Sequence, residues 1–177
     1  MANLFIISDT HFGHANILNF VDKEGKHLRT FGSVEEMDQH MVDRWNSVVR
    51  PQDHVYHLGD VAMKQQCIET VARCNGRKRL VRGNHDIFRT KKYLPYFEEI
   101  YGIRVLDGMI FTHIPIHPES LSRFKSNVHG HVHAQPQGHY GPRYYNVSVE
   151  AVDYTPVALE DLKLRIKKQQ EDTEEAH

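Results

Sequence analysis

Short apolar runs that end abruptly in Asp, Asn or His recur along this chain and constrain its fold more than any other feature. β-Branched apolar runs of this kind predict buried strands. In open α/β sheets, functional sites are built where such strands end. We therefore predict strands near residues 3–8, 54–60, 79–86, 126–133 and 144–150, and a hairpin over 103–115 that turns at Asp107 and Gly108.

Helical patterns separate these predicted strands. Ser33 and Glu36 form a capping-box pattern at the start of residues 33–49, where Met37, Met41, Trp45 and Val48 recur on one face. A second helix is predicted over roughly 62–74, and a third begins at Pro156, with 166–177 as a frayed tail. Strands alternating with helices, followed by a strand-rich half, predict an α/β sandwich. The length predicts one domain over residues 1–177.

Composition narrows the class of protein. The net charge of −1 gives no overall basic field for nucleic acid or membrane binding, whereas 14 His against 11 Gly favours a metal or proton-transfer site. The two cysteines, Cys67 and Cys74, lack zinc-site spacing and are expected to be thiols in a reducing compartment. No apolar run is long enough to span a bilayer. We therefore expect a cytoplasmic protein with no membrane partner.

The predicted strand ends supply oxygen and nitrogen ligands but no thiolate, a set that suits Mn²⁺, Fe²⁺ or Zn²⁺. These residues exceed what one four-coordinate ion needs, so their number indicates two ions that share a carboxylate. The motifs are Asp9-Thr10-His11, Gly59-Asp60, Gly83-Asn84-His85-Asp86, Thr112-His113 and Gly130-His131-Val132-His133.

The order D-x-H, GD, GNHD, H and GHxH, which spans residues 9 to 133, resembles the calcineurin-like metallophosphoesterase superfamily, and in particular its small single-domain bacterial and phage members. The resemblance implies a four-layer α/β/β/α sandwich with two mixed sheets. It also implies two divalent metal ions, Mn²⁺ foremost with Fe, Zn or Ni as alternatives. The implied activity is hydrolysis of phosphomonoesters or phosphodiesters by in-line attack of a metal-bridging hydroxide.

The resemblance also assigns roles to residues. His85 is the implied histidine that binds no metal and acts as general acid or stabilises the developing charge. The implied ligands are Asp9, His11 and His133 for one ion, Asn84, His113 and His131 for the other, and Asp60 as the bridge between them.

Other polar residues are weaker candidates. His14 and Arg29 could contact the substrate, although a capping role for His14 and a solvated surface position for Arg29 stay open. His117 is an alternative to His113, which is preferred because it directly ends the apolar run MIF. His129 lies outside the implied ligand pattern, and we expect it to be structural.

Three functions remain open at this stage. The first is hydrolysis of a small phosphate ester, with a nucleotide as one possible substrate. The second is a nuclease or cyclic-nucleotide phosphodiesterase that uses the seven Lys and Arg of residues 77–92, so that nucleic acid is a possible but not a required partner. The third is a metal-binding scaffold without turnover, against which His85 argues, because a scaffold does not need that histidine.

Overall fold

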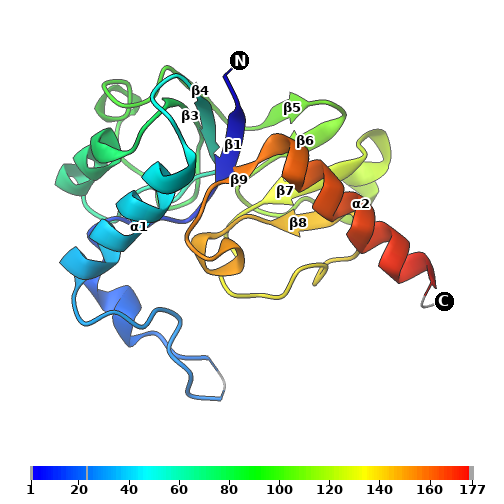
Figure 1. Cartoon of the computed structure of the whole chain (residues 1–177), viewed down its shortest axis with the longest axis horizontal. Helices are drawn as coiled ribbons and strands as arrows, with labels where there is room; N and C mark the ends of the chain where they lie inside the picture. Colours follow the sequence, from blue (N-terminus) through cyan, green and yellow to red (C-terminus); the bar gives the residue numbers. More distant parts are fainter. Residues whose placement is uncertain (1, 23, 176–177) are drawn as a thin grey trace.

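The computed structural model describes residues 2–22 and 24–175 and contains two mixed β-sheets (Figure 1). The first sheet has the strand order β4-β3-β2-β1-β9, and all its pairs are parallel except β1–β9. The second has the order β5-β6-β7-β8, with an antiparallel β5–β6 pair. The predicted α/β class with two mixed sheets is therefore confirmed.

The strands are short. The first sheet consists of β1 (Leu4–Ile7), β2 (His54–His57), β3 (Arg77–Val81), β4 (Glu99–Tyr101) and β9 (Val157–Ala158). The second consists of β5 (Arg104–Leu106), β6 (Met109–Phe111), β7 (Ser126–His129) and β8 (Tyr144–Asn146). The sequence predicted neither β4 nor β9. Each has only two or three residues and lacks the Asp-Gly turn that marks the equally short β5 and β6 in the sequence.

Alternating side chains of β1 belong to two different cores. Ile6 contributes to a cluster between the sheets that also contains Phe111 of β6 and Val128 of β7. Phe5 and Ile7 point the other way, into a cluster under helix α1 (Val34–Val48). This alternation is the expected geometry of a strand buried on both faces.

Helix α1 begins where the sequence predicts. The Ser33 side chain accepts a hydrogen bond from the backbone N–H of Glu36 at 3.1 Å, and Met37, Met41 and Trp45 are buried against the first sheet. The cap supplies a partner for an N–H group that the helix itself leaves free.

The remaining helical segments are short 3-10 turns, apart from α2 (Leu159–Glu175). The helix predicted over 62–74 is the 3-10 segment η2 (Gln65–Arg73). The prediction of a frayed tail from residue 166 is wrong. Helix α2 continues to Glu175, because Ile166 packs into the core between the sheets. Residues 176 and 177 lie outside the described part. The other 3-10 segments are η1 (Ala15–Asn19), η3 (Thr90–Lys92), η4 (Pro118–Arg123) and η5 (Val149–Val152).

The predicted hairpin is present between β5 and β6. Asp107 and Gly108 both have positive φ, 53° and 81°, as a two-residue hairpin turn requires. Within residues 2–22 and 24–175, no helix has the length and apolar character needed to cross a membrane.

We predict that replacing Leu162 with Ala lowers the free energy of unfolding by about 2 to 5 kcal/mol, because its side chain is fully buried between α2 and the sheets. Leu164→Ala on the same helix is the matched control, since Leu164 is 67% exposed and should change stability by less than about 0.5 kcal/mol. Urea unfolding measures both. Equal losses in the two variants would contradict this docking of α2.

Candidate metal centre

The carboxyl ends of β1, β2, β3, β6 and β7 meet at one edge of the two sheets. Asp9 follows β1 and Asp60 follows β2, and the two loops are joined by a hydrogen bond from the Asp9 N–H to the Gly59 carbonyl at 3.0 Å. A second bond links the His11 N–H to the Asp60 carbonyl, also at 3.0 Å. Parallel pairing of β1 with β2 therefore places both carboxylates side by side.

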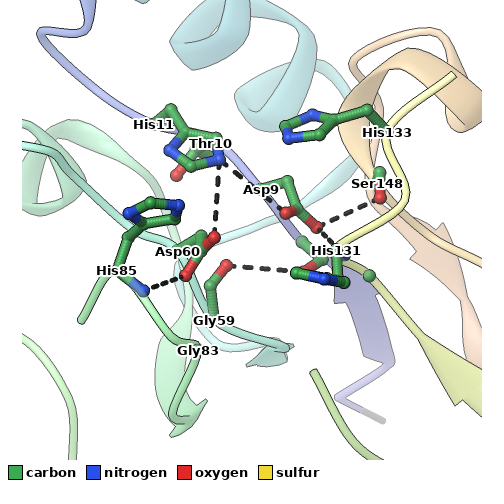
Figure 2. Close-up of polar contacts among 12 residues, drawn as sticks. Asp9, Thr10, His11, Gly59, Asp60, Gly83, His85, His131, His133 and Ser148 are labelled. Atoms are coloured by element: carbon green, nitrogen blue, oxygen red, sulfur yellow. Dashed lines mark hydrogen bonds and ion pairs between the residues drawn. The ribbon is translucent and has the colours of Figure 1, made fainter. Parts of the chain in front are cut away.

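Two groups of three side chains can each hold a metal ion, and in each group the potential ligand atoms lie within 4.8 Å of one another. Together they fit a dinuclear site. Figure 2 shows the two carboxylates at the centre with the histidines around them. The groups are Asp9, His11 and His133, and Asp60, His113 and His131.

Asp60 lies between the two groups. Its Oδ2 is 3.6 Å from His11 Nε2 and 3.3 Å from His113 Nε2. Asn84 joins the second group, because its Oδ1 is 2.8 Å from the same Nε2 of His113. The structure thus brings together all seven residues that the sequence analysis named as metal ligands, with the histidines divided between the two groups as expected.

Several buried polar atoms in this cluster have no hydrogen-bond partner. They include Asp9 Oδ1 and both ring nitrogens of His11. Buried polar atoms are almost always paired, so an unpaired set of ligand atoms needs a missing partner. A divalent cation is the partner that satisfies a carboxylate oxygen and an imidazole lone pair together.

The protonation states suit a cation. Burial lowers the pKa of His11 to about 2, so its ring is neutral and keeps a lone pair to donate. Burial alone would raise the pKa of Asp60, but the hydrogen bond with His113 and the charge of that ring lower it to about 2. Asp60 is therefore ionised across the neutral pH range.

The backbone under these side chains is unusual. Five candidate ligands have a left-handed backbone, with positive φ that costs energy in residues other than glycine. Such outliers persist where the surrounding structure enforces them, most often at functional sites. They are Asp9 (61°), His11 (49°), Asp60 (57°), His131 (71°) and His133 (49°).

Two glycines allow close approach to the carboxylates. A Cβ at Gly83 would lie 2.2 Å from Asp60 Oδ1, and one at Gly130 would lie 2.2 Å from Asp9 Oδ2. Any side chain at either position would displace a carboxylate. The glycine of each motif therefore makes room for an acid as well as allowing the chain to turn.

The prediction that Arg29 contacts substrate or lies on the surface is wrong. Arg29 is only 1% exposed, and its guanidinium donates to the carbonyls of Asp9 at 2.6 Å and Thr10 at 2.9 Å. Its Nε donates to Glu150 Oε1 at 2.8 Å. With these three contacts below the first metal group, Arg29 holds the D-x-H loop in position and is not free to bind a phosphate.

Glu150 was missed by the sequence analysis. Its Oε1 lies 3.1 Å from His133 Nδ1, so this carboxylate orients the ring and leaves Nε2 for the centre. Burial would raise the pKa of Glu150, but the charge of Arg29 and the hydrogen bond with His133 lower it to about 2. The only signal in the sequence was an acid that ends a predicted strand at 144–150.

Asp86 ends the GNHD motif, and the sequence analysis predicted no role for it. Its carboxylate accepts hydrogen bonds from the backbone N–H groups of Asp60, Val61 and Gly83, at 2.8, 3.0 and 2.9 Å. These bonds join the loop after β2 to the loop after β3. Ser148 similarly supports Asp9, because its hydroxyl lies 3.1 Å from Asp9 Oδ2.

The remaining histidines differ in position. The ring of His85 is exposed and its centroid is 5.6 Å from that of His11. His14 is half-buried with its ring 5.7 Å from His11, so its contact with substrate stays a prediction. His117 caps η4 at the surface, which leaves His113 as the candidate ligand. His129 is buried and its Nδ1 lies 2.9 Å from the Gly130 carbonyl, outside both groups.

The basic stretch 77–92 does not form one continuous patch. Arg77 and Arg79 pair with acids of the neighbouring strand, and Lys78 is largely buried and donates to the carbonyls of Cys74 and Gly76. Arg82 donates to backbone carbonyls of its own loop. The exposed cations of the stretch beyond these are Arg89, Lys91 and Lys92.

No protein-family model matches the sequence. The chain is 34% identical over 181 residues to the uncharacterized protein MJ1445 of Methanocaldococcus jannaschii, an alignment that covers 95% of this chain and 93% of the archaeal protein. The chain belongs to the same family as MJ1445.

Two further similarities accompany the MJ1445 match. Gene 66 protein of Mycobacterium phage L5 is 34% identical over 92 residues, which is 49% of this chain and 41% of the phage protein. Among solved structures, the protein of unknown function AQ665 from Aquifex aeolicus superposes with a TM-score of 0.67 at 27% identity, over 92% of this chain and 98% of that one. This chain, a relative of MJ1445, therefore shares its fold with AQ665 over nearly the whole length of both proteins.

We predict that Glu150→Gln flattens the acid side of the stability profile. Glu150 is buried and its pKa falls from 4.5 to about 2 on folding, so its contribution is fully present above pH 4.5 and is lost as the pH falls toward 2. At pH 7 the substitution should lower the free energy of unfolding by about 3 kcal/mol. Urea unfolding of chelator-treated protein from pH 2 to 7 measures it. The control is Glu160→Gln, whose side chain is 79% exposed. A profile for Glu150→Gln as steep as that of the wild type would refute the assignment.

Proposed function

We propose that this protein is a dinuclear-metal-dependent phosphoesterase of the calcineurin-like metallophosphoesterase superfamily, with that superfamily's four-layer sandwich. The observation that carries the proposal is the pair of adjoining ligand groups, the second of which contains Asp60, with buried ligand atoms that have no hydrogen-bond partner in the protein. A single structural ion would use one group and would leave the other unexplained.

Under this proposal Asp9, His11 and His133 hold one ion, and the second group with Asn84 holds the other. Bound there, the two ions would stabilise charge on the phosphoryl oxygens and would lower the pKa of a bound water, which would supply a nucleophile at neutral pH. The donor set of nitrogen and oxygen without sulfur suits Mn²⁺ foremost, with Fe, Zn and Ni as alternatives.

His85 is the proposed proton donor to the leaving oxygen. Its backbone N–H donates to Asp60 Oδ1 at 2.8 Å, which fixes the base of the residue against the centre. Its ring is exposed at the rim and lies beside His11, where it can reach an oxygen of a bound ester. A group at the rim can donate a proton without giving up a metal ligand.

The nuclease alternative has less support. Four of the seven basic residues in 77–92 are engaged with neighbouring acids or backbone carbonyls, so they offer no continuous track for a phosphate backbone. A small phosphate ester is therefore the proposed substrate. A location in the cytoplasm is part of the same proposal and rests on two cysteines, Cys67 and Cys74, that are free thiols.

We predict hydrolysis of 4-nitrophenyl phosphate or of its diester in the presence of Mn²⁺, and loss of that activity after treatment with a chelator.

Asp60→Ala should lose tight binding of both ions, because Asp60 lies between the two groups. Elemental analysis after gel filtration measures the metal content. Two ions retained by Asp60→Ala would contradict its bridging role, and no turnover with Mn²⁺, Zn²⁺ or Fe²⁺ on either ester would refute the enzyme proposal.

We predict that His85→Ala keeps both ions but loses about 10²- to 10⁴-fold in kcat, since it removes a proton donor and no ligand. His117→Ala is the control, because its side chain is 71% exposed and lies outside both groups. Loss of metal from His85→Ala would show that His85 supports the metal site and is not the acid.

A further inference from the structure

A groove of about 820 Å³ adjoins the candidate metal centre on the His133 side. One wall is a hairpin of residues 20–22 and 24–28, closed by hydrogen bonds from Leu28 N to Phe20 O at 2.8 Å and from Asp22 N to Lys26 O at 2.9 Å. This hairpin projects from the body of the protein (Figure 1). The other wall is the loop 132–135, so His133 borders both the groove and the metal centre.

The lining of the groove is mixed, with a cluster of apolar side chains beside charged and polar ones. Phe20 is 48% exposed and Val21 is 53% exposed, and both line the groove, as do Leu28, Val132 and Ala134. Exposed apolar side chains that gather in a hollow beside a reactive centre are typical of a ligand-binding surface. Phe20 also has its ring edge-on to His14 at 5.6 Å, which connects the hairpin to the histidines of the site.

The charges in the groove do not favour a polyanion. Asp22 and Glu24 are acidic, and Lys26 is basic. The Glu150 carboxylate at the inner end is already paired with Arg29 and His133. A phosphate-rich chain would meet more acid than base here. The groove therefore suits an uncharged organic group.

The position of His85 indicates whether the groove would hold the leaving group of the ester or the substituent that stays on phosphorus. His85 lies beside Asp60, and His133 lies beside Asp9, with His11 between the two rings at centroid distances of 5.6 and 5.2 Å (Figure 2). With His85 serving the leaving oxygen, the leaving group lies on the side of the GNHD loop. The groove on the other side is left for a substituent that stays on phosphorus.

We propose that this groove binds the retained organic substituent of a phosphodiester, an aromatic group such as an aryl ring or the base of a nucleoside. In the hydrolysis, the oxygen of water bonds to phosphorus, the bond from phosphorus to the leaving oxygen breaks, and that oxygen takes up a proton. The products are an alcohol and a phosphomonoester, whose organic group remains in the groove. The inference rests on the proposed function and names the substrate class of the same site.

Three esters that all release 4-nitrophenolate test the inference with Mn²⁺-loaded protein. They are 4-nitrophenyl phosphate, methyl 4-nitrophenyl phosphate and phenyl 4-nitrophenyl phosphate, which share a leaving group and differ in what stays on phosphorus. Comparing each variant with the wild type removes differences in intrinsic reactivity. Phe20→Ala should lower kcat/KM for the phenyl diester about tenfold more than for the methyl diester, and Val21→Ser should act in the same direction.

The matched control is Ile87→Ala, because Ile87 is 76% exposed and follows His85 on the opposite flank. It should keep the wild-type ratio of phenyl to methyl diester. An unchanged ratio in Phe20→Ala and Val21→Ser would overturn the groove inference while leaving the phosphoesterase proposal intact. If only Ile87→Ala lowered the ratio of phenyl to methyl diester, the retained group would lie on the flank of the GNHD loop and the inference would be wrong. Higher activity on the monoester than on the phenyl diester would also overturn the inference. No turnover of any of the three esters would refute the proposed function itself.

Discussion

The buried carboxylate of Asp60 is the interaction on which the site depends. One oxygen accepts the backbone N–H of His85, and the other lies between the imidazoles of His11 and His113. Its own backbone N–H is held by Asp86. Loops that follow β1, β2, β3 and β6 thus converge on one anion. A buried carboxylate without such partners would be expensive, so each loop is fixed in place by the need to satisfy it.

A second layer of polar contacts supports Asp9 in the same way. Arg29 fixes the carbonyl of Asp9 from below, and Ser148 reaches its carboxylate. Glu150 connects Arg29 to His133, so one chain of charges runs from the buried guanidinium to a candidate ligand. The left-handed backbone and the buried ligand atoms without hydrogen-bond partners are locally unfavourable, and the two apolar clusters flanking the first sheet hold this arrangement in place.

The two flanks of the site differ in character. The GNHD loop carries His85 and the exposed Ile87, followed by the exposed cation Arg89. The opposite flank is the hairpin of residues 20–22 and 24–28, with exposed Phe20 and Val21 and a small excess of acid. Under the proposed function, this asymmetry would give a bound ester two unlike environments, one for each side of the phosphorus. It follows from the order of the strands, because the loops after β1 and β7 lie on one side of Asp60 and the loop after β3 lies on the other.

The sequence by itself determined the strand ends and the ligand types at each of them. An apolar run followed by Asp, Asn or His is a local pattern that marked the strand ends, and the resemblance to a known family selected the seven candidate ligands among their residues. The capped helix α1 and the Asp107-Gly108 turn were also predicted from local patterns. The split of His129 from His131 and His133 also followed, because the glycine between them interrupts the strand.

Only the tertiary structure decided the supporting residues. From the sequence alone, Arg29 could not be distinguished from an ordinary surface cation. Its burial depends on the carbonyls of Asp9 and Thr10 and on the carboxylate of Glu150, which is 121 residues away. Ser148 acts on Asp9, 139 residues away, and Glu150 connects the distant Arg29 to His133, which is 17 residues from Glu150. The short strands β4 and β9 were not predicted, because their hydrogen bonds come from neighbouring strands and no local pattern marks them. Local patterns and the family resemblance therefore named the candidate ligands, whereas long-range burial of charge selected the residues that orient them.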